Sequence, residues 1–210
     1  MKTIDDFLTS ADTDISVAMS AKVRNKYCFV IQPPSRWGKT ADGRPVLFFG
    51  GVGGKVEQNE GLAEALRREA QEEIGCDIEI LIKADVGDLP LVNRENIGFE
   101  KVTATTQTPL PWCIFQNKRS ELGRKSMTNV FIYQARINNA EKMQPLDNPA
   151  IILLPEEVLY QMENGMDMAA ALRNGAEITT NIKLPADAVL QPTPTPLAII
   201  RLHRSGYSLL

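Results

Sequence analysis

The stretch from Gly54 to Cys76 reads GKVEQNEGLAEALRREAQEEIGC, and it completes a glycine-rich run, GGVGG, at residues 50–54. Such a density of glycine excludes regular structure and predicts a loop. Between residues 61 and 74, apolar residues recur at helical spacing, and Gly75 supplies a stop signal. The sequence therefore predicts a glycine loop that leads directly into an amphipathic helix.

Three carboxylates are predicted to gather on one face of this helix. Glu69, Glu72 and Glu73 stand at positions i, i+3 and i+4, a spacing that brings side chains together. Their repulsion costs about 0.2–0.5 kcal/mol per pair, and acidic groups near a helix C-terminus oppose the macrodipole. A divalent cation would offset this cost, since carboxylate oxygens suit Mg²⁺. Because bound magnesium polarises phosphorus and lowers the pKa of bound water, the cluster favours diphosphate hydrolysis.

The same segment resembles the Nudix box, the signature of the Nudix hydrolase family. In that pattern a glycine, a glutamate, an Arg-Glu pair, a Glu-Glu pair and a second glycine stand at fixed spacing, which is a specific signal. The aliphatic positions hold Ala70 and Cys76, and Val52 stands where the family often has a proline. All seven fixed positions match, at Gly54, Glu60, Arg68, Glu69, Glu72, Glu73 and Gly75.

The resemblance implies an α/β (α+β) Nudix fold, a mixed β-sheet sandwiched between α-helices. It implies Mg²⁺, with Mn²⁺ as the alternative, and it makes Arg68 the residue that orients two neighbouring glutamates, Glu60 and Glu69. A further acid from a later loop is expected, and Glu95, Glu100 and Glu121 are equal candidates. The catalytic residues that the resemblance implies are Arg68, Glu69, Glu72 and Glu73, with Glu69 as ligand or general base. The implied metal ligands are the Gly53 carbonyl, Glu69, Glu72 and Glu73. The implied structural residues of the motif are Gly54, Glu60 and Gly75.

Outside this segment, β-rich apolar runs predict strands, and amphipathic runs predict two further helices. Strands are expected at 27–31, 45–49, 78–82, 102–106, 112–115, 129–137 and 151–154, a short helix near 4–8, and helices at 156–162 and 166–172. Residues 1–20 are expected to be an N-terminal extension, 21–175 the Nudix domain and 176–210 a C-terminal extension. In the last, a Pro-Thr spacer precedes Leu197–Leu202, which would suit an edge strand or an arm to a second subunit, giving a homodimer.

Composition restricts the partners and the compartment. The net charge of −3, with lysines and arginines interspersed, excludes a nucleic-acid-coating role. No apolar run approaches membrane-spanning length, and the N-terminus does not resemble a secretory signal. Three widely spaced cysteines are typical of free thiols in the reducing cytoplasm.

The expected substrate is a nucleoside diphosphate derivative, with ADP-ribose or a nucleoside triphosphate as first choices. Pro90 stands near the place where some ADP-ribose-cleaving relatives have a proline. The alternative function is a non-catalytic nucleotide-binding sensor. A solvated helix face is the usual explanation of clustered glutamates, but the complete signature outweighs it here. His203 is expected at the surface, and core packing is favoured over base stacking for Trp37, Trp112, Phe115 and Tyr133.

Overall fold

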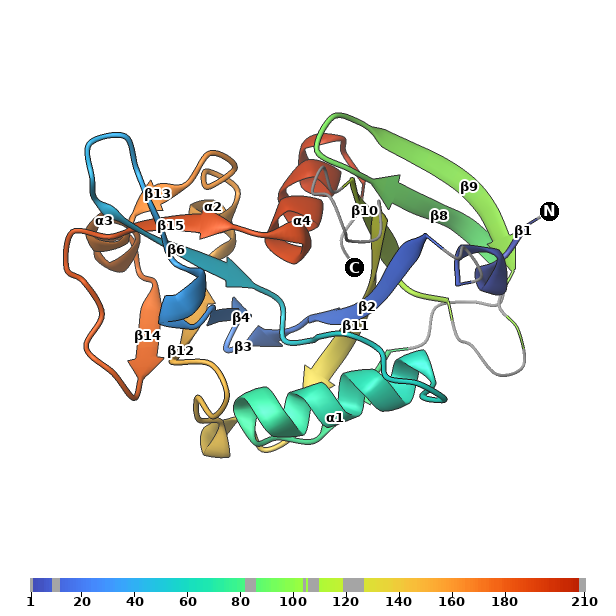
Figure 1. The fold of residues 1–210 in the computed structure, drawn as a ribbon, viewed down its shortest axis with the longest axis horizontal. Helices are drawn as coiled ribbons and strands as arrows, with labels where there is room; N and C mark the ends of the chain where they lie inside the picture. Colours follow the sequence, from blue (N-terminus) through green and yellow to red (C-terminus); the bar gives the residue numbers. More distant parts are fainter. Residues whose placement is uncertain are drawn as a thin grey trace.

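The computed structural model describes residues 2–8, 12–81, 86–103, 105, 110–118 and 127–207. Within these residues the strands form two mixed sheets, and helices lie on both sides of them (Figure 1). The predicted α+β class, with mixed sheet and helices on either side, is confirmed.

The first sheet has the order β1-β9-β8-β10-β11-β2 in the described part of the chain, with β7 paired to β11. The pairs β1/β9, β8/β10 and β2/β11 are parallel, and the remaining pairs are antiparallel. Its strands are β1 (Lys2–Thr3), β2 (Thr13–Ser20), β7 (Ile78–Ile80), β8 (Val86–Val92), β9 (Ile97–Thr103), β10 (Cys113–Lys118) and β11 (Met127–Ile137).

The second sheet has the order β13-β15-β6-β4-β12-β14, with β3 paired to β4 and β5 to β6. Only β15 and β6 run parallel among these described strands. Its strands are β3 (Lys22–Val23), β4 (Lys26–Ile31), β5 (Gly38–Lys39), β6 (Pro45–Gly50), β12 (Ala150–Leu154), β13 (Met166–Asp167), β14 (Glu177–Thr180) and β15 (Val189–Pro192).

The two longest described helices, α1 (Leu62–Ile74) and α4 (Pro194–Arg204), cover opposite sides of the strands (Figure 1). Helix α1 ends where Gly75 adopts φ 66°, a left-handed conformation that favours glycine. The shorter helices are α2 (Glu156–Leu159) and α3 (Met168–Arg173), and the 3-10 turns are η1 (Ile4–Phe7), η2 (Pro34–Arg36) and η3 (Ala140–Lys142).

Successive strand residues point alternately into two cores, because side chains of a strand alternate between its faces. In β2, Val17 and Met19 belong to the core under α1, whereas Ala18 belongs to the core under α4. In β4, Cys28 and Phe29 divide in the same way. Strands covered on both faces are apolar throughout, which explains the continuous apolar runs in the sequence.

The expected edge strand or arm at Leu197–Leu202 was wrong. Residues 197–202 form no edge strand or arm; they lie in α4, and all but the partly exposed Arg201 are buried in this chain's own core. Pro194 occupies the first helical turn, where a missing N–H costs nothing, so the proline-rich spacer begins the helix. Residues 13–20 form β2 inside the first sheet, while the division of the chain at residues 20 and 175 stays a prediction.

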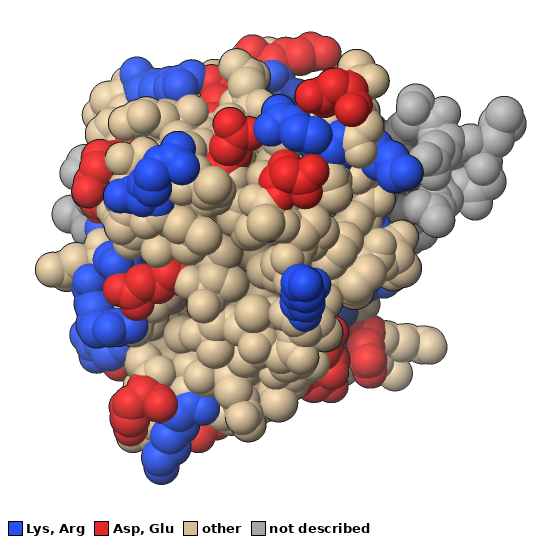
Figure 2. All heavy atoms as spheres, turned by 90° about the vertical axis from the view of Figure 1, so that its left-hand side faces the viewer, with Lys and Arg blue, Asp and Glu red and all other residues tan. Residues whose placement is uncertain are grey.

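One face of the molecule, the side that carries β13, β14 and α3, shows basic and acidic side chains interspersed (Figure 2). Ion pairs in this region join Arg44 to Asp167 and both Arg24 and Lys26 to Glu177. Among the described residues, no helix combines the length and apolarity needed to cross a bilayer.

Candidate active site

The glycine loop leaves β6 and lies directly against β2. The Val17 N–H donates to the Gly54 carbonyl at 2.9 Å, and the Met19 N–H donates to the Val52 carbonyl at 2.9 Å. Gly53 has φ 150°, and a Cβ there would lie 2.1 Å from the Val17 carbonyl oxygen. Glycine is therefore required at Gly53 by both conformation and space.

Gly54 makes room for a carboxylate. A Cβ at Gly54 would lie 2.2 Å from Oε1 of Glu69 and 2.5 Å from its carboxyl carbon. The Glu69 side chain is 13% exposed, so it lies in a pocket that the bare glycine backbone leaves open. Burial raises the pKa of Glu69, and the neighbouring Arg68 opposes that rise.

Arg68 joins three carboxylates of the signature. Its Nε and Nη2 donate to the two oxygens of Glu60 at 2.8 and 3.0 Å, and its Nη1 donates to Glu69 at 2.8 Å and to Glu72 at 2.9 Å. This bidentate pairing holds the pKa of Glu60 below its ordinary value. Arg68 thus contacts Glu60 and Glu69, the two glutamates it was expected to orient, and also Glu72.

Glu73 faces away from Arg68, into the protein. Its side chain is buried, its Oε2 accepts the Gly53 N–H at 2.8 Å, and its Oε1 accepts the Asn148 side-chain amide at 2.5 Å. Burial raises the pKa of Glu73 to about 7, while the Gly53 and Asn148 hydrogen bonds act in the opposite direction. Asn148 was not predicted, because no local sequence pattern links it to a residue in α1.

The donor set is that of a hard cation: carboxylate oxygens beside the backbone of Gly53. Among the described residues, no group of three acidic, histidine or cysteine side chains is gathered closely enough to enclose a metal ion. Arg68 holds one oxygen each of Glu69 and Glu72, and no described residue donates to the second oxygen of either. These oxygens fit a divalent ion that would draw Glu69, Glu72 and Glu73 together.

A cleft of about 620 Å³ opens on the other side of the glycine loop. Gly53 and Gly54 line it, and the same two residues contact Glu73 and Glu69, so the cleft adjoins the carboxylate cluster. Strands β2, β6, β10 and β11 and the start of α4 supply its walls. Its other lining residues include Asp14, Gln32, Arg36, Phe48, Lys55, Asn117, Thr128, Val130, Thr193, Pro194 and Thr195.

Two of the three candidates for an additional acid, Glu95 and Glu100, lie among the described residues. Glu95 lines a cavity of about 200 Å³ that shares Asn117 with the main cleft, so the two cavities adjoin. Glu100 lies on β9 and pairs with Lys2 at 2.7 Å, and it does not line the cleft. Glu121 lies outside the described residues. Of the two described candidates, Glu95 lies nearer to the main cleft, and the identity of the additional acid stays a prediction.

The aromatic residues mostly agree with the packing expectation. Trp112, Phe115 and Tyr133 are buried, and Trp37 is partly buried with its Nε1 donating to the Gln32 carbonyl at 2.7 Å. His203 is exposed as expected and stacks on Tyr160, with ring centroids 3.6 Å apart. Pro90 lies in β8 and does not line the cleft.

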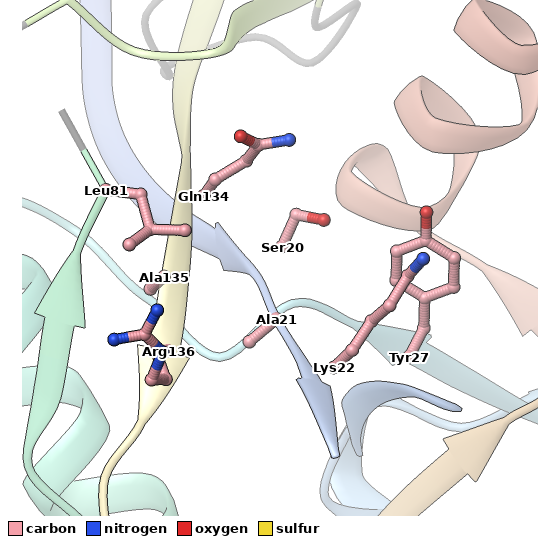
Figure 3. Close-up of a pocket in the computed structure, with 8 residues that line it drawn as sticks. All are labelled: Ser20, Ala21, Lys22, Tyr27, Leu81, Gln134, Ala135 and Arg136. Atoms are coloured by element: carbon pink, nitrogen blue, oxygen red, sulfur yellow. The ribbon is translucent and has the colours of Figure 1, made fainter. Parts of the chain in front are cut away.

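A smaller cavity of about 210 Å³ lies between β2, β7 and β11 (Figure 3). Figure 3 shows Leu81 and Arg136 on one side of it and Lys22 and Tyr27 on the other. Both cations are already paired, Arg136 with Glu79 and Lys22 with Glu156. None of the described residues that line this cavity belongs to α1 or to the glycine loop. The 620 Å³ cleft is therefore the candidate substrate site.

The NUDIX domain family model matches residues 16–105. No curated protein sequence matches the chain.

Several solved structures are similar at low identity. They include the Escherichia coli ORF135 protein (16% identity, 71% of this chain and 78% of that chain, TM-score 0.41) and a NUDIX hydrolase from Nitrosomonas europaea (15%, 60% and 60%, 0.36). A structure described as UDP-X diphosphatase covers 98% of this chain and 71% of its own, at 10% identity and TM-score 0.43. With TM-scores below 0.5, these likenesses carry no inference about activity. The matched residues include the whole signature from Gly54 to Cys76, so residues 16–105 of this chain are similar to a NUDIX domain.

Proposed function

We propose that this protein hydrolyses a diphosphate linkage in a nucleoside diphosphate derivative, using Mg²⁺ or Mn²⁺. The observation that carries the proposal is that the glycine loop contacts both the cleft and the carboxylates of α1. Gly53 and Gly54 line the 620 Å³ cleft and also touch Glu73 and Glu69, so a diphosphate in the cleft would lie beside the carboxylates. When bound, the cation would polarise the phosphoryl group and acidify a water molecule.

The proposed roles divide among residues of α1 and the glycine loop. Glu72, Glu73 and the Gly53 carbonyl would hold the cation, with Glu69 as a further ligand or as the base that accepts a proton from water. The raised pKa of Glu69 suits a base, because a carboxylate is a better proton acceptor when its pKa approaches neutrality. Arg68 would keep Glu69 oriented through its 2.8 Å bond. Gly54, Glu60 and Gly75 shape the loop and the helix ends.

The cleft lining supports a substrate with a modest charge. Among the described lining residues the cations are Arg36 and Lys55, and Lys55 is paired with Asp14 at 3.1 Å. Most of the remaining lining is neutral, with amides, hydroxyls and the Phe48 ring. This composition favours a diphosphate that carries a sugar or a nucleoside, such as ADP-ribose, over a nucleoside triphosphate with its larger charge. A cytoplasmic location belongs to the same proposal, and the three free cysteines support it.

The test is phosphate release, coupled to a phosphatase, from nucleotide sugars, dinucleotides and nucleoside triphosphates, with Mg²⁺, with Mn²⁺ and with neither. Metal-dependent cleavage of a nucleotide sugar, exceeding that of the triphosphates, would establish the reaction and its substrate class. Binding of these ligands without cleavage of any would contradict the proposal and favour the sensor.

A further inference from the structure

Residues 144–148 are hydrogen-bonded through their backbone to the C-terminal end of α1. The Gln144 N–H donates to the Ile74 carbonyl at 3.2 Å, the Leu146 N–H to the Glu73 carbonyl at 3.1 Å, and the Asp147 N–H to the Glu72 carbonyl at 3.3 Å. The last carbonyls of a helix have no partner within it. This segment therefore satisfies three of them, and it is fixed relative to α1 by main-chain bonds.

The next residue, Asn148, turns its side chain into the protein. It is 5% exposed, and its Nδ2 donates to Oε1 of Glu73 at 2.5 Å, across a sequence separation of 75 residues. Oε2 of Glu73 accepts the Gly53 N–H. Two donors from two distant segments thus hold one carboxylate, one oxygen each, and together they fix its position and the orientation of its plane.

A buried carboxylate has to be held by donors, because desolvation of a charged group is costly. Replacing both partners by apolar side chains would satisfy the packing as well, so stability alone does not require this pair. An amide donor leaves the charge on Glu73 intact for a cation, whereas a lysine or arginine would neutralise it. Asparagine therefore fits a carboxylate that is oriented without a permanent counter-charge beside it.

We infer that Asn148 is a positioning residue that fixes the Glu73 carboxylate for divalent-cation binding. The inference rests on the proposed function, since it gives Glu73 the role of a ligand. Asn148 lies outside the Gly54–Cys76 signature. Outer partners that orient a metal ligand typically change metal affinity by about 10–100-fold when they are removed.

The experiment measures Mn²⁺ binding to the full chain by electron paramagnetic resonance, without substrate. Asn148→Ala should raise the Mn²⁺ Kd by about 10–100-fold. Asn148→Leu, which keeps most of the side-chain volume but cannot donate, should do the same and guards against an alanine variant that fails to fold. Asn174→Ala is the matched control, because that exposed amide donates only to the Ala170 carbonyl. It should bind Mn²⁺ as the wild type does.

A double-mutant cycle with Glu73→Gln separates positioning from general stability. If Asn148 acts through Glu73, Asn148→Ala will not weaken Mn²⁺ binding further in the Glu73→Gln background. An equal loss in both backgrounds, or an unchanged Kd in the Asn148 variants, would overturn this inference while leaving the proposed function intact. If the Glu73→Gln variant bound Mn²⁺ and turned over substrate as the wild type does, the proposed function would be overturned, and this inference with it.

Discussion

Helices α1 and α4 cover opposite sides of the same strands, and their surroundings differ. Helix α4 is buried from Thr195 to Ile200 and again at Leu202, so most of its length packs into the core. Helix α1 buries a stripe that includes Leu66, and the carboxylates of Glu69 and Glu73 lie within or beside that stripe, with Arg68 holding Glu69. A helix segment packed in the core stabilises the fold, whereas a helix that carries carboxylates beside a cleft can also present chemistry. Substitutions in the part of α4 buried in the core should therefore change stability, and substitutions of the α1 carboxylates should change reactivity.

The largest expected effect is in α1. Glu73→Gln should abolish metal-dependent turnover, and Glu69→Gln should lower it by about 10²–10⁴-fold if Glu69 is the base. Neither should change the circular dichroism spectrum, because an amide keeps the shape of the side chain. Glu57→Gln, which changes an exposed glutamate before α1, is the control and should leave turnover unchanged. Full activity in the Glu73 variant would contradict the expectation that α1 governs reactivity while α4 governs stability.

The opposite outcome is expected in α4. Ile199 is fully buried in the core beneath this helix, so Ile199→Ala should lower the free energy of unfolding by about 2–5 kcal/mol, measured by urea denaturation. Mn²⁺ affinity of the folded variant should stay as in the wild type. Leu172→Ala, at a side chain that is 42% exposed, should cost far less. A loss of metal affinity in the Ile199 variant would show that the two sides are coupled.

A pH effect should sharpen the comparison in the metal-free protein. Burial raises the pKa of Glu73 to about 7, against an ordinary 4.5, so the folded state binds this proton more tightly than the unfolded state does. Protonated Glu73 therefore contributes on the order of 3 kcal/mol to the free energy of unfolding. This contribution is fully present below about pH 4.5 and is lost as the pH rises to about 7. Glu73→Gln should lack this loss. Parallel curves for the two proteins between pH 5 and 8 would contradict it.

The smallest expected effect is at the glycine loop. Gly54→Ala would place a Cβ against the flexible end of Glu69, and the carboxylate would be displaced while the backbone stays in place. Turnover should fall about 10–100-fold, since small displacements of a catalytic group are costly. The melting temperature should change little. Gly98→Ala, where a Cβ would meet nothing within 4 Å, is the control. Unchanged turnover would mean that Glu69 tolerates displacement.

The difference between the two helices also explains what the sequence could reveal. Helix α1 was predicted almost to the residue because its apolar stripe, its acidic side and Gly75 are all local signals. Helix α4 was mistaken for an extended arm, because prolines followed by continuous apolar residues lack any helical period. The contact of Asn148 with Glu73 had no local signal either, since only the folded chain brings residues 75 positions apart together.

The parallel pairing of β2 with β11 has a consequence for how the chain folds. Thr13 pairs with Met127 and Ser20 with Gln134, so this ladder joins segments separated by more than half the chain. Pairing across such a separation is slow, because a long loop must close before any contact rewards it. During synthesis β2 emerges early and has to wait for β11, so its apolar residues stay exposed until most of the protein has been made.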